Sequence, residues 1–211
     1  RNPFSTTMNK NGYSLSKLKS AKNPKSLTAG DVEKLKQFDY EKYPQLANSW
    51  RMFMFSFWMF GMNFADICKL THENLQNGRI IYARQKTGKV FNLKVRNEAQ
   101  EIIDYFASDS NSYLFPVYNE HVHITPMQKK NRSKKMLKQI GQDLKEIAKI
   151  LGIETHITFY VARHTSATTL KRNGIANELI SEALGHSNPQ ITQLYLKKFD
   201  NYVLDDAMSR L

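Results

Sequence analysis

Residues 162–168 read Ala-Arg-His-Thr-Ser-Ala-Thr, residues 184–187 read Leu-Gly-His-Ser, and residues 191–195 read Ile-Thr-Gln-Leu-Tyr. Upstream, residues 85–88 read Gln-Lys-Thr-Gly and add a lysine to the arginine, histidine and tyrosine of these segments. Such a set suits phosphoryl transfer, because guanidinium groups bind and neutralise the non-bridging oxygens of a phosphodiester. A tyrosine hydroxyl held in that field can attack phosphorus, and a lysine ammonium can protonate the leaving oxygen.

Arg163, His186, Tyr195 and Lys86 each also have an ordinary structural explanation. An arginine beside a histidine on a helix usually forms a salt bridge or a cap, and a tyrosine near a chain end usually packs against the core. A Lys-Thr-Gly sequence is common in hairpin turns. Taken singly, these explanations are favoured. The joint occurrence of the four residues in this order and spacing favours the chemical interpretation instead, provided that the fold brings them together.

The apolar pattern around these segments predicts a mainly helical chain. Thr28 and Asp31 have the spacing of a capping box at a helix start. The helix that begins at Pro44 is apolar on every face, which is typical of a centrally buried helix. An amphipathic spacing runs from Met136 to Gly152. Shorter helices are expected over residues 63–70, 98–107, 158–172, 176–184, 189–198 and 203–211.

Two runs with strand-like composition, at residues 78–84 and 90–95, flank a short turn that contains Lys86. This arrangement predicts a β-hairpin with a basic tip. Residues 109–131 contain two prolines and show no apolar period, so we expect a loop there. The expected fold class is therefore mainly α with a small antiparallel β-sheet or hairpin (α+β).

The charge of the chain indicates a polyanionic partner. Its 211 residues include 31 Lys+Arg and 19 Asp+Glu, which gives a net charge of +12. Half of this excess lies in residues 1–27, which contain no acid and are expected to form a flexible arm. An acid-free segment between Glu120 and Asp143 is also basic, and a solvated helix face is the usual explanation of such a run. Together with the arm and the hairpin tip, it favours contact with a phosphate backbone through Lys129, Lys130, Arg132, Lys134, Lys135 and Lys138.

Several classes of protein are disfavoured. Cys68 is the only cysteine, so the sequence contains no disulfide framework and no zinc–thiolate site, as expected for a reducing compartment. His121 and His123 lack a third candidate ligand nearby, and no nucleotide-binding glycine loop is present. The longest apolar run, residues 50–62, is shorter than the roughly 20 residues of a membrane span. We therefore expect no metal, no cofactor and no membrane partner.

In these motifs the sequence resembles the tyrosine recombinase (phage integrase) family, over about residues 27–211. In style it is similar to integrases of conjugative transposons and related mobile elements of Bacteroides-type bacteria. The resemblance rests on the three C-terminal segments and on the Gln-Lys-Thr-Gly turn. It implies a tyrosine recombinase catalytic domain over residues 28–211. Residues 1–27 would then be the linker to the upstream core-binding domain of the family, which is absent from this sequence.

The resemblance also implies roles for the motif residues. Tyr195 would be the nucleophile that forms a 3′-phosphotyrosyl link to DNA. Arg163 would bind the scissile phosphate, His186 would donate a hydrogen bond to it, and Lys86 would be the general acid. Two further residues match positions that support the site in the family, His164 and Asp66.

Two positions depart from the family pattern. In the first box of the family pattern, Asn63 follows Gly-Met where the family usually has an arginine, so half of the phosphate clamp lacks its charge. In the second box, Tyr160 precedes Arg163 by three residues where the family usually has a histidine, and a tyrosine is a poor base at neutral pH. Both remain candidate catalytic positions. The cations that could replace the missing arginine are Arg51, Arg84 and Arg96.

The function implied by the resemblance is site-specific recombination, meaning integration or excision of a mobile element, without cofactor. The implied partners are double-stranded DNA and further copies of the protein, which would form a tetramer on synapsed DNA and be a monomer when free. Accessory DNA-bending proteins are also compatible with the resemblance. The implied location is the bacterial cytoplasm, on the nucleoid. The apolar stripe of residues 203–211 suits packing on its own core or on a neighbouring protomer, and sequence favours neither.

Two alternatives remain open at the level of sequence. Asn63 and Tyr160 suit a DNA-binding protein on the same fold with weakened or lost catalysis, although the four retained motif residues argue against it. A type IB topoisomerase would use the same chemistry. Relaxation of supercoiled DNA without site preference would favour that activity.

Overall fold

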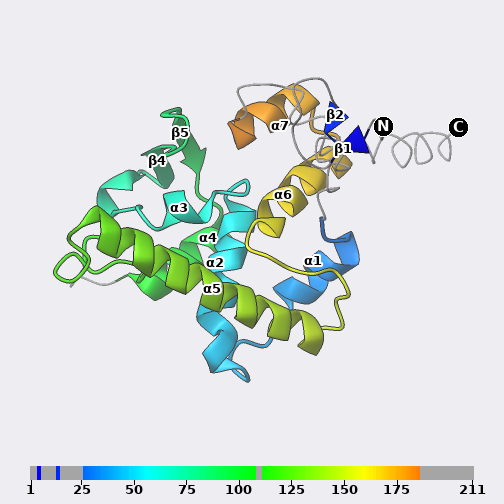
Figure 1. Cartoon of the computed structure of the whole chain (residues 1–211), viewed down its shortest axis with the longest axis horizontal. Helices are drawn as coiled ribbons and strands as arrows, with labels where there is room; N and C mark the ends of the chain where they lie inside the picture. The colour runs from blue at the N-terminus through cyan, green and yellow to red at the C-terminus, as the bar shows by residue number, and fades with distance from the viewer. Residues whose placement is uncertain (1–3, 6–12, 15–25, 108–110, 186–211) are drawn as a thin grey trace, which may run out of the picture.

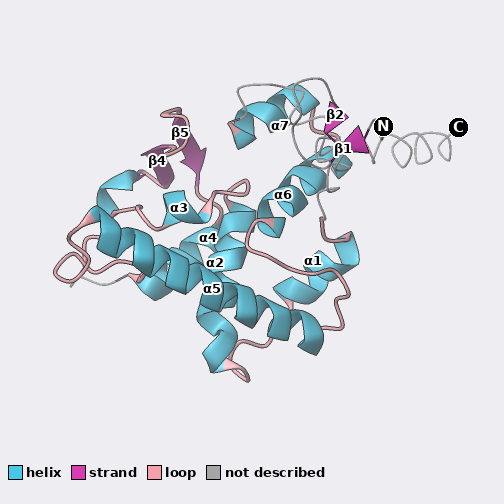
Figure 2. Ribbon diagram, viewed as in Figure 1, coloured by secondary structure: helices cyan, strands magenta, loops and turns pink. Residues whose placement is uncertain are grey.

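The computed structural model describes residues 4–5, 13–14, 26–107 and 111–185. The described part is mainly helical, with a three-stranded antiparallel sheet at one side (Figures 1 and 2). The predicted fold class is therefore confirmed. The helices predicted over residues 189–198 and 203–211 lie outside the described residues.

Helix α2 (Pro44–Trp58) forms the centre of the core. Proline is tolerated in its first turn because the N–H that proline lacks would have no intrahelical partner there. The apolar residues that follow on every face bury most of the helix. It contacts α4 (Asn97–Phe106), α5 (Pro126–Ile150) and α6 (Val161–Arg172), and α5 crosses in front of it in Figure 1. The prediction of a centrally buried helix is confirmed.

Helix α1 (Ala29–Lys36) begins with the predicted capping box, in which Thr28 and Asp31 exchange side-chain-to-backbone hydrogen bonds. Leu27, which the sequence places at the end of the arm, lies in the core with 1% of its surface exposed. Its N–H donates to Thr165 Oγ1 on α6 at 3.1 Å, so the packed fold extends one residue into the proposed arm. Earlier in the chain, β1 (Phe4–Ser5) pairs in parallel with β2 (Tyr13–Ser14).

Helix α5 starts at Pro126, ten residues before the predicted start at Met136. The expected loop over residues 109–131 therefore ends at residue 125, and this part of the prediction is wrong. Thr125 and Gln128 form a capping box, which fixes the helix start. The first turns carry mostly polar and basic residues, so they contain no apolar period that would reveal a helix.

The predicted hairpin is present as β4 (Arg79–Ala83) and β5 (Val90–Lys94), which pair antiparallel with Ala83 opposite Val90. A short strand that the sequence does not reveal, β3 (Leu75–Gln76), adds to the other edge of β4. Just upstream of this sheet, α3 (Phe64–Ile67) is shorter than the predicted helix over residues 63–70.

Helix α7 (Asn177–Leu184) packs on α6 through a small cluster of Ala167, Ile180 and Leu184. It ends at Gly185, which has a left-handed backbone with φ of 62°. A Cβ at this position would lie 2.3 Å from Phe91 Cζ on β5, so only glycine lets the end of α7 approach the hairpin this closely. The hairpin and the end of α7 thus meet.

Candidate functional site

Arg163 joins two segments that are far apart in the sequence. It lies in the first turn of α6 and is 6% exposed. Its Nη1 donates to the Gly61 carbonyl at 3.0 Å, and its Nη2 donates to the Leu184 carbonyl. The arginine of the 162–168 motif therefore contacts both the turn before Asn63 and the end of α7, directly before the 184–187 histidine motif.

The turn at Gly61 approaches the α6 backbone too closely for any other residue. Gly61 has φ of +69°, and a Cβ there would lie 2.4 Å from Arg163 Cα. Its N–H donates to the Ser56 carbonyl at 2.7 Å, which holds the turn against the end of α2. Glycine at this position therefore sets the distance between the turn at residues 61–63 and Arg163.

The two departures from the family pattern share one cavity with Arg163. Asn63, Tyr160 and Arg163 line a cavity of about 110 Å³, together with apolar residues such as Phe64 and Phe159. Asn63 is the N-cap residue of α3, and its side chain makes no capping hydrogen bond. Tyr160 is 47% exposed. The positions that the resemblance identifies as first-box and second-box residues therefore line one cavity with Arg163.

His164 lies beside this cavity and is buried. Its ring contacts the Tyr160 ring edge-on, with 4.6 Å between the centroids. Burial, with a further contribution from the neighbouring Arg163 charge, lowers the pKa of His164 to about 4. The imidazole is therefore neutral at pH 7 and adds no positive charge to the site, which fits a supporting role.

Asp66 links α3 to the hairpin turn. Its carboxylate, which is buried, accepts a hydrogen bond from the Gln85 backbone N–H at 2.9 Å. The turn itself is closed by the Gly88 N–H donating to the Arg84 carbonyl at 2.8 Å. Lys86 follows Gln85 and is exposed at the tip of the turn. Asp66 therefore anchors the base of the turn that presents the lysine.

The three cations considered for the missing first-box charge lie in different surroundings. Arg51 is buried between the Tyr40 and Tyr105 rings, 4.7 and 3.5 Å from their centroids. Arg96 is exposed and forms an ion pair with Glu98 at 3.0 Å. Arg84, in contrast, is buried at the base of the hairpin turn and donates from Nη1 to the Leu184 carbonyl.

The phenol of Tyr82 lies among the charges of this region. Burial raises its pKa, the Asp66 carboxylate raises it further, and Arg163 and Arg84 act in the opposite direction. The Tyr82 phenol is therefore harder to ionise than an ordinary tyrosine, which makes it a poor candidate nucleophile. Its surroundings show that Asp66, Arg163 and Arg84 share one electrostatic environment.

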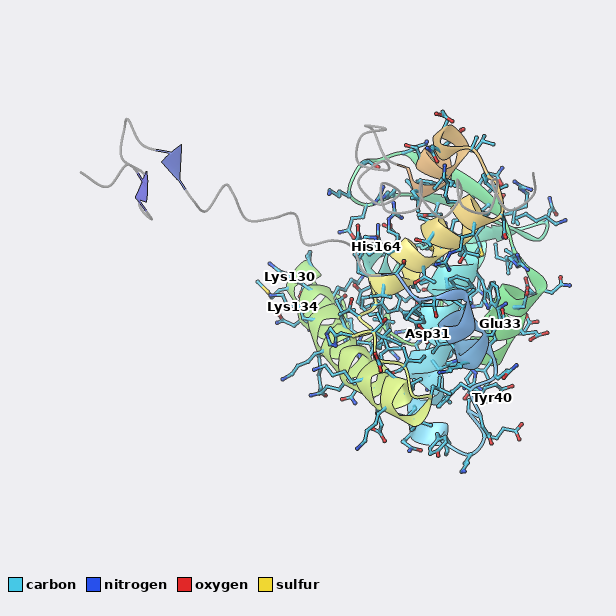
Figure 3. The ribbon with its side chains drawn as sticks, turned by 90° about the vertical axis from the view of Figure 1, so that its right-hand side faces the viewer. Asp31, Glu33, Tyr40, Lys130, Lys134 and His164 are labelled. Atoms are coloured by element: carbon cyan, nitrogen blue, oxygen red, sulfur yellow. The ribbon has the colours of Figure 1, made fainter. Side chains whose placement is uncertain are left out.

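The basic residues of α5 separate into two groups. Lys129 donates to the Tyr113 hydroxyl at 2.9 Å, and Arg132 donates to the Val117 carbonyl at 3.0 Å, so both are half-buried and engaged. Exposed side chains make up the other group, namely Lys130, Lys134, Lys135 and Lys138. Lys130 and Lys134 lie near one end of α5 (Figure 3).

A groove of about 830 Å³ runs between α5, α3 and the hairpin turn. Lys130 and Lys134 line it from α5, Lys69 from the end of α3, and Gln85 from the turn. Lys69 carries no signal in the sequence, because it stands alone rather than in a basic run, and only the tertiary fold brings it to the α5 lysines. The groove joins the basic helix to the turn that carries Lys86.

His186 and Tyr195 lie outside the described residues, so the structure gives no position for either side chain. The described chain ends at Gly185, directly before His186. Of the predicted site, the structure brings together Arg163, Asn63, Tyr160, His164 and Asp66, with the hairpin turn of Lys86 attached through Asp66.

Other kinds of site find little support in the described residues. Across the ranges that the structure describes, no three His, Cys, Asp or Glu side chains are grouped so as to hold a metal ion. Burial raises the pKa of the Cys68 thiol to about 12, so it is protonated at neutral pH and unreactive. Among the helices in the described ranges, none has both the length and the apolar character needed to cross a membrane.

Comparison with known proteins gives consistent matches. Residues 25–201 match the model of the phage integrase family. Tyrosine recombinase XerA of Pyrococcus furiosus is 28% identical over 179 residues, which are 82% of this chain and 57% of that protein. XerA of Thermococcus kodakarensis is 26% identical over 177 residues, which cover 82% of this chain and 58% of that protein. The chain therefore spans less than two thirds of the length of these curated relatives.

Solved structures match the fold. A crystal structure of XerA recombinase superimposes with a TM-score of 0.62 at 21% identity, covering 89% of this chain and 65% of that one. The Tn1549 transposon integrase, in complex with transposon right-end DNA, has a TM-score of 0.63 at 17% identity and covers 94% and 70%. A lambda integrase tetramer bound to a Holliday junction has a TM-score of 0.60 at 17% identity and covers 84% and 49%. These likenesses confirm the fold predicted from the sequence.

Proposed function

The chain belongs to the phage integrase family, and on this premise we propose that it is the DNA-cleaving catalytic domain of a tyrosine recombinase. Residues 28–211 would form this domain, and residues 1–27 would be its basic linker. The activity is site-specific recombination: one DNA strand is cut and rejoined to another, so that a mobile element is integrated or excised.

One observation carries the proposal. The Arg163 guanidinium contacts the first-box turn at Gly61 and the end of α7 at Leu184, and it lines a cavity with Asn63 and Tyr160. The turn at residues 61–63, Tyr160 and Leu184 therefore surround one buried cation. A phosphodiester is the anion that this chemistry suits, because a guanidinium matches the geometry of its paired non-bridging oxygens.

The reaction follows from the chemistry of these groups. The Tyr195 hydroxyl gives up its proton to solvent, and its oxygen attacks the scissile phosphorus while the bond between phosphorus and the 5′ oxygen breaks. Lys86 gives a proton to the departing 5′ oxygen, which leaves as a hydroxyl, and the 3′ end remains joined to Tyr195 as a phosphotyrosine. A 5′ hydroxyl from the partner strand then reverses these steps. One ester replaces another each time, so no external energy source is needed.

Arg163 and His186 stabilise the charge that builds up on the phosphate oxygens. His164 is neutral and buried against Tyr160, so its part is to position neighbouring groups. Asn63 and Tyr160 can each donate a hydrogen bond into the shared cavity but contribute no positive charge there. Asp66 positions the lysine turn through Gln85.

Duplex DNA lies along the groove of α5, α3 and the hairpin in this proposal. Lys69, Lys130 and Lys134 line that groove, and neutralising phosphates with lysines is the usual source of DNA affinity. We further propose that the protein acts as a tetramer on two synapsed sites, is a monomer when free, and works with accessory DNA-bending proteins. Because the substrate is the genome, the reaction takes place in the bacterial cytoplasm.

A suicide substrate tests the activity. A duplex with a nick close to the cleavage site loses a short 5′-hydroxyl fragment after cleavage, which traps the covalent complex. We expect a protein–DNA adduct that resists denaturing electrophoresis and disappears in Tyr195→Phe, while Tyr105→Phe, a change at an exposed tyrosine of α4, leaves it intact. DNA binding without any adduct would instead indicate a DNA-binding protein that has lost catalysis. Relaxation of supercoiled DNA without site preference would indicate a topoisomerase.

A further inference from the structure

Arg84 occupies an unusual position for a charged residue. It follows the last residue of β4 and is 8% exposed. Its Nη1 donates to the carbonyls of Leu184 at 3.1 Å and Gly185 at 2.8 Å. Its Nε is fully buried and has no hydrogen-bond partner in the part of the chain that the structure describes. A buried donor without a partner is costly, and an acceptor atom of a bound ligand would satisfy it.

Arg84 and Arg163 lie side by side, because both donate to the carbonyl oxygen of Leu184. Two buried guanidinium groups repel each other in a medium of low dielectric. Within residues 26–107 and 111–185, no carboxylate forms an ion pair with Arg84. An anion bound at this pair would remove the repulsion, and it would be held by two charges.

The other two arginines considered as replacements for the missing first-box charge have surroundings that do not suit a phosphate site. Arg51 is enclosed by the Tyr40 and Tyr105 rings, and Arg96 is exposed with its charge matched by Glu98. Within the described ranges, neither donates a hydrogen bond to the carbonyls that accept from Arg163. Of these arginines, Arg84 alone shares a hydrogen-bond acceptor with Arg163 within the described structure.

We propose that Arg84 is the second cation of the phosphate site, and that with Arg163 it neutralises the scissile phosphodiester in place of the first-box arginine, where this chain has Asn63. This proposal rests on the recombinase activity proposed above. The hairpin then contributes twice to the reaction, with Arg84 at the base of the turn binding the phosphate and Lys86 at its tip protonating the leaving oxygen. Arg84 also donates to the Gly185 carbonyl, which ties the phosphate site to the residue directly before His186.

The rate of adduct formation on the nicked substrate tests this role. We expect Arg84→Gln to slow cleavage by about 100-fold or more, as loss of one oxyanion donor usually does, with Arg84→Lys intermediate because it keeps the charge but loses the fork. Arg79→Gln is the matched control, because Arg79 lies at the other end of β4 and is exposed. Equal rates in Arg84→Gln and the wild type would overturn the proposal.

Arg84 also anchors the end of α7, so a second substrate separates charge from structure. A methylphosphonate at the scissile position replaces one non-bridging oxygen with a methyl group and removes the negative charge. With no charge to neutralise, the defect of Arg84→Gln should shrink to about tenfold or less. A defect of the same size on both substrates would mean that Arg84 acts only by holding the fold, and this too would overturn the proposal.

Inorganic phosphate supplies a readout that does not depend on DNA cleavage. At matched ionic strength, sodium phosphate should raise the Tm of the wild type and of Arg79→Gln above the value in sodium chloride, because an anion bound only to the folded state stabilises it. The increment should be lost in Arg84→Gln. An Arg84-dependent increment without any DNA adduct would refute the proposed activity and leave the anion site standing. A DNA adduct that forms at the wild-type rate in Arg84→Gln, together with a phosphate increment in Tm that does not depend on Arg84, would refute the anion site and leave the proposed activity standing.

Discussion

The Asp66 carboxylate accepts a hydrogen bond from the Gln85 backbone N–H at 2.9 Å, which fixes the lysine turn to α3. The acceptor is buried, so its removal leaves a partly buried N–H without a partner. The turn that presents Lys86 is therefore positioned by the same short segment that contains Asn63.

Asp66→Ala should lower the free energy of unfolding by about 1–3 kcal/mol, the usual cost of an unsatisfied buried group. It should also slow adduct formation, because Lys86 loses its fixed position. Asp66→Asn keeps an acceptor oxygen and should recover much of both losses. Urea unfolding and the suicide-substrate rate measure the two effects. Equal rates for Asp66→Ala and the wild type would show that the anchor does not serve the reaction.

Lys86→Ala should reduce cleavage strongly, because the departing 5′ oxygen then lacks a proton donor. A substrate with sulfur in place of that bridging oxygen leaves as a thiolate, which has a much lower proton affinity, and should cleave at a near-normal rate in the variant. Lys89→Ala is the control within the same hairpin, since Lys89 is exposed and lies over the Phe91 ring. Lack of recovery with the sulfur substrate would exclude Lys86 as the general acid.

The two ends of α5 should differ in DNA binding. Replacing Lys130 and Lys134 with Gln should reduce the slope of log K against log salt concentration by about 2, one unit per lost phosphate contact. Replacing Lys145 and Lys149 removes the same charge from the far end of the same helix and should change the slope much less. Equal changes in the two double variants would show that the groove does not define the DNA path.

Gly61→Ala should destabilise the fold by more than a Gly→Ala change at a left-handed position with open space around it. The left-handed backbone costs an alanine about 1–2 kcal/mol, and the new Cβ would also lie 2.4 Å from Arg163 Cα. Gly88 has the same φ of +69°, and no atom lies within 4 Å of the place that an added Cβ would take, so Gly88→Ala isolates the backbone cost. Chemical denaturation of the two variants should show the larger loss for Gly61→Ala, and similar losses would contradict the close approach.

Stability should fall as the pH is lowered from about 6.5 to about 4, in part because of His164. Its folded-state pKa of about 4 lies below the ordinary value of 6.5, so in this window the unfolded chain binds a proton that the folded chain does not. The contribution of His164 is complete above that window and is lost as the pH falls through it. Tm measured against pH should decline less steeply in His164→Gln, and identical profiles would argue against a buried neutral imidazole.

Several elements could be predicted from the sequence because their signals are local. The capping box of Thr28 and Asp31, the apolar helix after Pro44 and the hairpin around Lys86 all follow from patterns within a few residues. The convergence of Asn63 and Tyr160 with Arg163 could be predicted only through the family resemblance. Helical spacing alone places Tyr160 near Arg163, but it gives no reason to place Asn63 beside them.

Other features depend on tertiary contacts that no local pattern reports. The first ten residues of α5 are mostly polar, so apolar periodicity does not reveal their helix even though Thr125 and Gln128 form a capping box. The two-residue strand β3 exists because β4 offers it an edge. The shared carbonyl of Arg84 and Arg163 joins residues that are distant in the sequence, so the sequence can name Arg84 as a candidate but cannot place it.

In the proposed reaction, Tyr195 becomes joined to the 3′ end of a cleaved DNA strand. The most direct test is mass spectrometry of the peptide from the trapped adduct, combined with end-labelling that identifies which strand end is attached. We expect a nucleotide joined to Tyr195 through a 3′ phosphate, with a free 5′ hydroxyl on the released fragment. A link to another residue, a 5′-phosphate attachment, or cleavage without any covalent link would contradict this mechanism.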